Sequence, residues 1–198
     1  MEFKTSDLIW TRPPKKFSVS PDKITITTDP NTDLWQRTYY GFQNDNAPVL
    51  QTKISKKYFS FVVKTNFASK TRFDQSGIVM YLDSDNWFKA SVEYENEKIQ
   101  RLGCVVTQHG YSDWCSNDIP ADIKSIWFRF SRRESDYYVE FSLDGKDWKQ
   151  MRMFHFFKGE GEINLGIYAC SPGKEASFEA EFTNFELSEC KWEKKRNI

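Results

Sequence analysis

Apolar residues recur at every second position in short segments of this chain. The clearest case is residues 59–67, where Phe59, Phe61, Val63, Thr65 and Phe67 alternate with more polar neighbours. Successive side chains of a β-strand point to opposite faces, so this spacing predicts one face on a core and one facing away from it. Helical periodicity is nearly absent, and the alternation therefore predicts a fold built from strands.

Further segments are rich in Val, Ile, Phe, Tyr or Thr, the residues that fit a pleated, half-buried surface. The expected strands are Lys23–Thr28, Thr38–Phe42, Phe59–Phe67, Gly77–Leu82, Phe88–Tyr94, Cys104–Gln108, Ser125–Arg132, Tyr137–Leu143, Ile163–Ala169 and Ser177–Leu187. Short strands separated by turn residues predict an all-β fold of two antiparallel sheets packed as a sandwich. No linker or repeat divides the sequence, so we expect one domain over residues 1–198.

The charge balance bears on the kind of partner. Lysine plus arginine number 28 and aspartate plus glutamate also number 28, so the formal net charge is zero. Binding to phosphate backbones needs clustered positive charge, so we expect no nucleic-acid partner. The N-terminal segment Met1–Asp7 is charged and lacks the apolar run of a secretory signal, and no stretch is apolar enough to cross a membrane. We therefore expect a cytoplasmic protein with no membrane partner.

The four cysteines are Cys104, Cys115, Cys170 and Cys190. Their spacing contains no CxxC pair and no zinc-like pattern, so we expect free thiols, no metal site and no cofactor. Cys104 and Cys170 lie in apolar runs, as buried cysteines do. Cys115 would be a reactive thiol only if it were exposed beside a cation, and we expect it to be structural.

The strand around residues 86–95 carries the most informative polar face. Phe88, Ala90, Val92 and Tyr94 share one face and predict contact with the core. The opposite face carries an indole, an ammonium and carboxylates, from Trp87, Lys89, Ser91, Glu93 and Glu95. This row suits a groove for a hydroxyl-rich ligand, and it also suits an ordinary solvated sheet face.

Several motifs resemble one known family. The matching segments are Thr32–Arg37, Tyr39–Phe42, Phe73–Gly77, Asn86–Lys89 with Glu93, Val105–Thr107, Tyr111–Trp114, Ser142–Gly145 with Trp148, Arg152, and Gly166–Pro172. Together they resemble the domain of unknown function numbered 1349, whose members look like concanavalin A-like lectin/glucanase jelly rolls. Within that family the chain is most similar to the fungal proteins named for regulation of enolase. The family has no established reaction, so the resemblance implies fold more than function.

The resemblance also implies where a ligand would bind. In a jelly roll of this kind the concave side of one sheet is the usual carbohydrate groove. The residues that we expect to line it are Asp74, Gln75, Trp87, Lys89, Glu93, Thr107, Tyr111, Asp113 and Trp114. Indole faces combined with a few placed polar groups are what concave ligand sites offer. The alternative for Asp113 and Trp114 is that they only hold a loop in place.

Three functions remain open at this stage. Related glucanases place their carboxylates in an alternating Glu-x-Asp-x-x-Glu pattern, which the segment after Glu93 does not reproduce. A glycoside hydrolase using Glu93 and Asp74 is therefore the alternative to a non-enzymatic regulatory protein with a lectin-like groove. The resemblance to the regulation-of-enolase proteins implies, thirdly, a protein partner linked to glycolysis.

Overall fold

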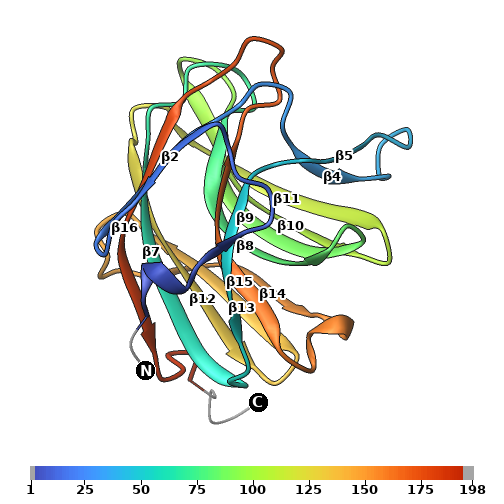
Figure 1. The fold of residues 1–198 in the computed structure, drawn as a ribbon, viewed down its shortest axis with the longest axis vertical. Coiled ribbons are helices and arrows are strands. Elements are labelled where there is room, and N and C mark those ends of the chain that lie inside the picture. The colour runs from blue at the N-terminus through green and yellow to red at the C-terminus, as the bar shows by residue number, and fades with distance from the viewer. Residues whose placement is uncertain (1–2, 194–198) are drawn as a thin grey trace.

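The computed structural model describes residues 3–193, which form two seven-stranded antiparallel sheets packed face to face (Figure 1). Sheet A contains, in spatial order, β1 (Ile9–Trp10), β6 (Val49–Ile54), β15 (Ile163–Cys170), β8 (Gln75–Asp83), β9 (Asn86–Tyr94), β10 (Ile99–Gln108) and β11 (Tyr111–Pro120). Sheet B contains β14 (Lys149–His155), β13 (Asp136–Ser142), β12 (Ser125–Arg133), β7 (Tyr58–Phe67), β16 (Glu179–Ser188), β3 (Lys23–Thr27) and β2 (Lys16–Val19). The expected all-β sandwich is confirmed.

The main core lies between the two sheets. It contains core-face side chains that the alternation of β7, β9 and β12 predicts: Phe59, Phe61, Val63, Phe88, Val92, Phe128 and Phe130. Each of these is at most 1% exposed. Tyr94, which the alternation also placed on the core face, is only half-buried at the end of β9. Removing this apolar surface from water is the main free-energy term that favours the folded state.

The predicted strand Thr38–Phe42 is wrong. These residues form the turn between β4 (Leu34–Gln36) and β5 (Gln43–Asp45), and Tyr39, Tyr40 and Gly41 have φ angles of 70°, 55° and 72°. A positive φ ends strand geometry, whatever the aromatic content of the segment. The prediction also missed β11, whose many polar residues are typical of a strand at the edge of a sheet.

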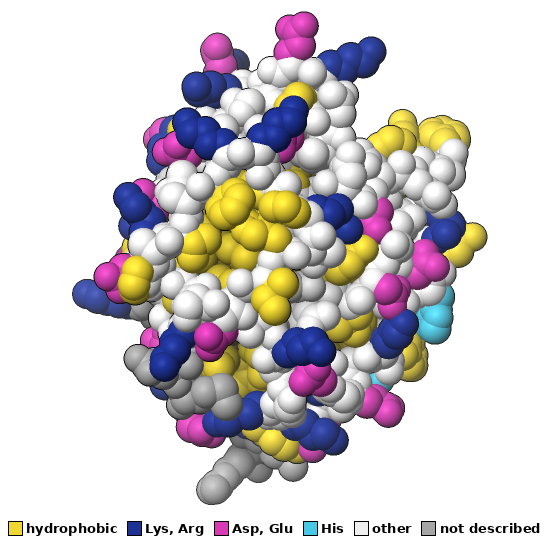
Figure 2. All heavy atoms as spheres, in the orientation of Figure 1, with side chains coloured by type: hydrophobic (Ala, Val, Ile, Leu, Met, Phe, Trp, Pro, Cys, Tyr) yellow, Lys and Arg dark blue, Asp and Glu magenta, His cyan; other side chains and the backbone are white. Residues whose placement is uncertain are grey.

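The hairpin β4–β5 lies on the side of sheet A that points away from sheet B (Figure 1). Two short 3-10 turns, Thr5–Asp7 and Phe157–Gly159, complete the described secondary structure. Among residues 3–193 no helix has the length and apolar character needed to span a bilayer. Acidic and basic side chains alternate over the face seen in Figure 2, around a patch of apolar side chains.

Candidate functional site

The candidate site lies on the face of sheet A that points away from sheet B, called here the outer face. Strands β8 to β11 pair in register, so residues directly opposite one another form rows across this face. One row is Gln75, Glu93, Arg101 and Asp118, and the next is Gly77, Ser91, Gly103 and Ser116. A charged row therefore borders a row of small residues.

Gly103 contributes no side chain to this second row, and little space is available for one. A Cβ atom at position 103 would come within 2.8 Å of the carbonyl oxygen of Cys115 and 3.0 Å of Nε1 of Trp114. Any larger residue would displace the Trp114 indole from its position over the strand. The row of small residues is thus a shallow surface, and the Trp114 ring lies beside it.

The hairpin β4–β5 covers one end of the outer face. Beneath it lies a second apolar cluster, formed by Leu34, Ala47, Val49, Val79, Tyr81, Trp87, Val105, Tyr168 and Cys170. Trp87 is 0% exposed, and its Nε1 donates to the carbonyl of Ser84 at 3.1 Å. We expected Trp87 to offer its ring to a ligand; the structure instead buries it, because the hairpin covers a face that the strand pattern alone leaves open.

Lys89 is also buried beneath the hairpin. Its Nζ donates to the carbonyl oxygen of Leu34 at 2.9 Å and to Oε1 of Gln75 at 2.8 Å, and it lies 3.4 Å from Oδ1 of Asp33. A buried ammonium needs such partners, since an unpaired one carries a large desolvation cost. Lys89 therefore fixes the hairpin to the sheet and does not face a ligand directly.

Glu93 sits at the edge of this polar cluster. Nε2 of Gln75 lies 3.3 Å from Oε2 of Glu93 and 3.5 Å from Oδ1 of Asp33. Burial raises the pKa of Glu93 to about 7; Lys89 and Arg101 oppose this rise, and Asp33 and Glu95 add to it. Near neutral pH the carboxyl is thus divided between its acid form, which donates a hydrogen bond, and its carboxylate, which only accepts.

Arg101 and Trp114 lie in the accessible part of the outer face. The guanidinium of Arg101 lies 5.5 Å from the centroid of the Trp114 ring, and Nε of Arg101 lies 3.4 Å from Oε2 of Glu95. Trp114 is 43% exposed. Together with Glu93, these side chains bring an indole face, a fixed cation and a carboxyl to the border of the small row.

Asp74, Thr107 and Tyr111 do not join this cluster. Asp74 is 0% exposed and accepts hydrogen bonds from the amides of Lys70 and Thr71, both at 2.9 Å, and from Oγ of Ser171 at 2.7 Å. These bonds hold the loop before β8. Asp74 is therefore a loop anchor and offers no carboxylate to a ligand.

Thr107 is fully buried and shares a hydrogen bond of 2.8 Å with Ser112. The Ser112 hydroxyl in turn accepts from the amide of Gln36 at 2.9 Å, which ties the hairpin to β11. Tyr111 is 63% exposed at the start of β11 and stands on the same side of that strand as Asp113.

Asp113 lies on the opposite face of sheet A from Trp114. The two residues are consecutive in β11, so their side chains point to opposite sides. Oδ1 of Asp113 accepts from Nη2 of Arg152 on β14 at 2.9 Å. We expected both residues to line one groove, and the extended strand separates them.

Sequence reasoning missed Asp33 and Arg101. Asp33 approaches Lys89 and Gln75 only because the hairpin folds across the sheet, a long-range contact that no local spacing reports. Arg101 was left outside the expected strand, which began at Cys104, although β10 begins at Ile99. Extending the alternation back from Val105 would have placed Arg101 on the outer face.

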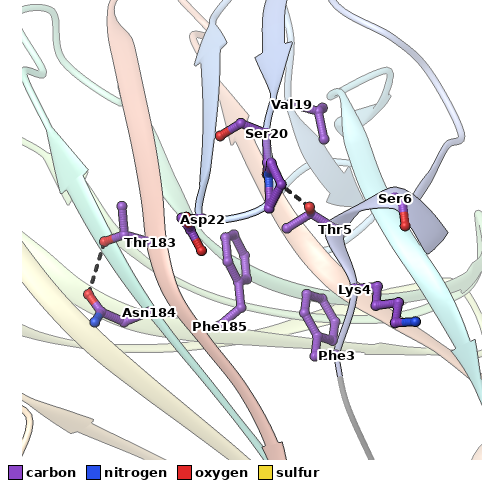
Figure 3. A pocket seen from close by; sticks show the side chains of 11 residues that line it. Phe3, Lys4, Thr5, Ser6, Val19, Ser20, Asp22, Thr183, Asn184 and Phe185 are labelled. Carbon is purple, nitrogen blue, oxygen red and sulfur yellow. Dashed lines mark hydrogen bonds between the residues drawn. The ribbon is translucent and has the colours of Figure 1, made fainter.

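A separate hollow of about 720 Å³ lies between the N-terminal segment and β16 (Figure 3). Phe3 and Phe185 stack there with ring centroids 5.4 Å apart, and Thr5 Oγ1 donates to the carbonyl of Ser20 at 2.8 Å. Among the described residues that line it, Asp22 is the one carboxylate, and they show none of the clustered chemistry of the outer face. We therefore place the site on the outer face.

The family model described as "Protein of unknown function (DUF1349)" matches residues 10–190. "Regulation of enolase protein 1" from Saccharomyces cerevisiae is 28% identical over 175 residues, which cover 87% of this chain and 86% of that protein. A crystal structure of a functionally unknown protein from Saccharomyces cerevisiae superposes with a TM-score of 0.86 at 26% identity, covering 94% of this chain and 98% of the other.

A GH43 protein from Bacillus licheniformis, BlXynB, has the same fold over part of its length. The TM-score is 0.72 at 19% identity, and the match covers 92% of this chain and 37% of that one. Most of the GH43 chain thus has no counterpart here. This likeness concerns the sandwich fold.

Proposed function

Since the chain belongs to the DUF1349 family, whose description gives no function, we propose from its own geometry that it is a non-catalytic regulatory protein that binds a carbohydrate on the outer face of sheet A. The observation that carries the proposal is the grouping of Glu93, Arg101 and Trp114 beside the small row of Ser91 and Gly103. Hereafter Glu93, Arg101 and Trp114 are called the outer-face triad.

Each member of the triad suits a sugar. The half-exposed indole of Trp114 offers a flat apolar surface to the C–H face of a pyranose ring. Arg101 donates hydrogen bonds from a guanidinium that is already positioned by Glu95, so little side-chain entropy is lost on binding. The Glu93 carboxyl, with its pKa of about 7, can accept from or donate to a hydroxyl.

The burial of Asp74 favours binding over hydrolysis. Glycoside hydrolases generally use two carboxyl groups on either side of the scissile bond. Asp74, the partner that the sequence offered to Glu93, is fully buried and accepts three hydrogen bonds from the protein itself. The hypothesis of hydrolysis by the pair Glu93 and Asp74 is therefore not supported by this geometry.

The name of the yeast relative supports a regulatory role. That protein is named for regulation of enolase, and the match covers 86% of its length. We extend this to the present chain as a proposal: binding of a carbohydrate would change how the chain interacts with a protein partner linked to glycolysis. A cytoplasmic location is part of the same proposal.

A thermal-shift screen against mono- and oligosaccharides tests the proposal. A ligand that binds only the folded chain adds RT ln(1 + [L]/Kd) to the free energy of unfolding and so raises the melting temperature. We expect at least one saccharide class to raise it, and we expect the saccharide to be recovered intact after prolonged incubation. A screen without any shift at millimolar saccharide contradicts the binding proposal, and release of a shorter sugar contradicts the non-catalytic part.

Hydrolysis remains a second candidate through a different pair, Glu93 and Asp33. Because one amide nitrogen of Gln75 contacts both carboxyl groups, their nearest oxygens are at most about 7 Å apart, close enough for two carboxyl groups to act on one glycosidic bond. A pKa of about 7 also suits Glu93 as a general acid. If turnover is found, Glu93→Gln and Asp33→Asn should each abolish it, whereas Asp74→Asn should spare it in the folded fraction.

A further inference from the structure

A pair of cysteines lies opposite one another at the edge of sheet A. Cys104 of β10 and Cys115 of β11 are direct partners in the antiparallel register, so their side chains share one face of the sheet. Cys104 belongs to the main core and is 1% exposed, whereas Cys115 is exposed. The pair therefore joins a sheltered thiol to one that reagents in water can reach.

A cation from the other sheet stands beside Cys115. Nη1 of Arg152, on β14, lies 3.5 Å from Sγ of Cys115, while Nη2 of the same guanidinium donates to Asp113 at 2.9 Å. Arg152 thus connects the edge of sheet B to the edge of sheet A with both of its terminal nitrogens. This is the exposed, cation-flanked setting that makes a thiol reactive, and the structural role that we expected for Cys115 from sequence does not describe it.

The two thiols differ in acidity. A hydrogen bond from the Cys104 thiol lowers the pKa of Cys115 to about 6; burial opposes this change and Arg152 adds to it. The same hydrogen bond, together with burial, raises the pKa of Cys104. Cys115 is accordingly the nucleophile of the pair, and Cys104 is held beside it in the protonated state.

We propose that Cys104 and Cys115 form a reversible dithiol–disulfide pair in which Cys115 reacts first with a hydroperoxide. The Cys115 thiolate attacks the terminal peroxide oxygen, the O–O bond breaks, and the products are a Cys115 sulfenic acid and water or an alcohol. Cys104 then gives up its proton, forms the S–S bond and releases water. Two electrons pass to the peroxide, and a dithiol reductant returns them by thiol–disulfide exchange.

The register allows this bond with little movement of the backbone. Residues directly opposite one another in an antiparallel pair have Cα atoms about 4.5–5.5 Å apart. Disulfides bridge Cα atoms about 4.4–6.8 Å apart. The bond would join the edge strand β11 to β10 and remove the thiolate from Arg152. The inference is independent of any carbohydrate binding.

Peroxide treatment with peptide mapping tests the proposal. We expect a modest excess of hydrogen peroxide to remove the Cys104 and Cys115 thiols of the reduced chain. After cleavage before Asp113, which separates the two cysteines, their peptides should remain linked by a disulfide, and thioredoxin or dithiothreitol should restore both thiols. In Cys104→Ser, dimedone should trap a sulfenic acid at Cys115. The control Cys190→Ser changes one of the two cysteines outside the pair and should behave as the parent chain does.

Two results would overturn the proposal. One is a chain whose Cys104 and Cys115 remain reduced under peroxide that oxidises a free thiol peptide, and the other is a bond from Cys115 to Cys190 or to a second chain. A second measurement does not depend on the disulfide: the rate of iodoacetamide labelling of Cys115 should rise with a midpoint near pH 6. Arg152→Gln should raise that midpoint, and a parent midpoint near the ordinary thiol value of about 8.5 would contradict the account.

Discussion

Nζ of Lys89 donates a hydrogen bond of 2.9 Å to the backbone carbonyl of Leu34, so a cation in the middle of sheet A holds the hairpin that covers it. The same ammonium contacts Gln75, whose amide reaches Glu93. The cover, the buried cation and the candidate acid are therefore parts of one polar network. A change at Lys89 should affect both the attachment of the hairpin and the acidity of Glu93.

Replacing Lys89 with methionine tests this coupling. Lys89→Met leaves the Leu34 carbonyl without this donor, the Gln75 amide oxygen with only the Tyr168 hydroxyl, and Asp33 without its cation. We expect it to lower the free energy of unfolding by about 2–4 kcal/mol in urea titrations. Lys64→Met is the matched control, because Lys64 lies over the Trp127 ring on sheet B and is partly exposed. A loss at Lys89 no larger than the control's would contradict the anchoring role.

The raised pKa of Glu93 predicts a dependence of stability on pH. The folded chain holds the Glu93 proton up to about pH 7, whereas the unfolded chain releases it near 4.5. In that window the native state binds more protons, so the contribution of Glu93 to the free energy of unfolding falls as pH rises, by roughly 1–3 kcal/mol. Glu93→Gln should remove this fall.

The measurement is urea unfolding of the parent and Glu93→Gln at several pH values between 4.5 and 8. The difference between the two proteins isolates Glu93 from the other titrating groups. We expect Glu93→Gln to gain stability relative to the parent as pH rises. The control Glu97→Gln changes an exposed residue between β9 and β10, and its free energy of unfolding should follow that of the parent across the same pH range. A constant difference across the window would show that Glu93 titrates normally.

Gly110 should be far less replaceable than Gly41. Both have positive φ angles, +78° and +72°, so alanine is strained at either position. A Cβ at Gly110 would also come within 2.0 Å of Nη1 of Arg37, which donates to the Gly110 carbonyl and to Asp85, whereas a Cβ at Gly41 meets nothing within 4 Å. We expect Gly41→Ala to cost about 1 kcal/mol and Gly110→Ala about 2–4 kcal/mol.

The double variant Arg37→Ala/Gly110→Ala separates the two causes. If the clash with Arg37 is the extra cost, the double variant should lose less than the sum of the two single losses. Chemical denaturation of the four proteins forms a double-mutant cycle. Strict additivity would mean that the guanidinium simply moves aside.

Asp74 should affect stability and leave ligand binding unchanged. Asp74→Asn places amide hydrogens toward donors that need an acceptor, so we expect a loss of about 2–4 kcal/mol and a lower melting temperature. Asp122→Asn, at an exposed turn residue, is the control and should change little. The folded fraction of Asp74→Asn should bind the saccharide with the affinity of the parent chain. A loss of affinity in that fraction would show that Asp74 belongs to the binding site.

The sequence predicted the sandwich because the alternation in β7, β9 and β12 is a local property of each strand. The same alternation correctly placed Lys89 and Glu93 on the face opposite Phe88. It could not predict that Trp87 and Lys89 would be buried, because their cover is a hairpin some fifty residues earlier in the chain. Asp113 was misplaced for a different reason: a strand was interpreted as a loop, and one strand step reverses a side chain.

Calorimetric titration of the saccharide selected by thermal shift tests the central claim most directly, with Trp114→Ala compared against Trp148→Ala. Trp148 is the matched control because an arginine, Arg129, also lies over its ring, at 4.3 Å, but on sheet B. The account predicts at least a tenfold loss of affinity, about 1.4 kcal/mol, for Trp114→Ala and parental affinity for Trp148→Ala. Equal affinities for the two variants would contradict carbohydrate binding at the outer-face triad.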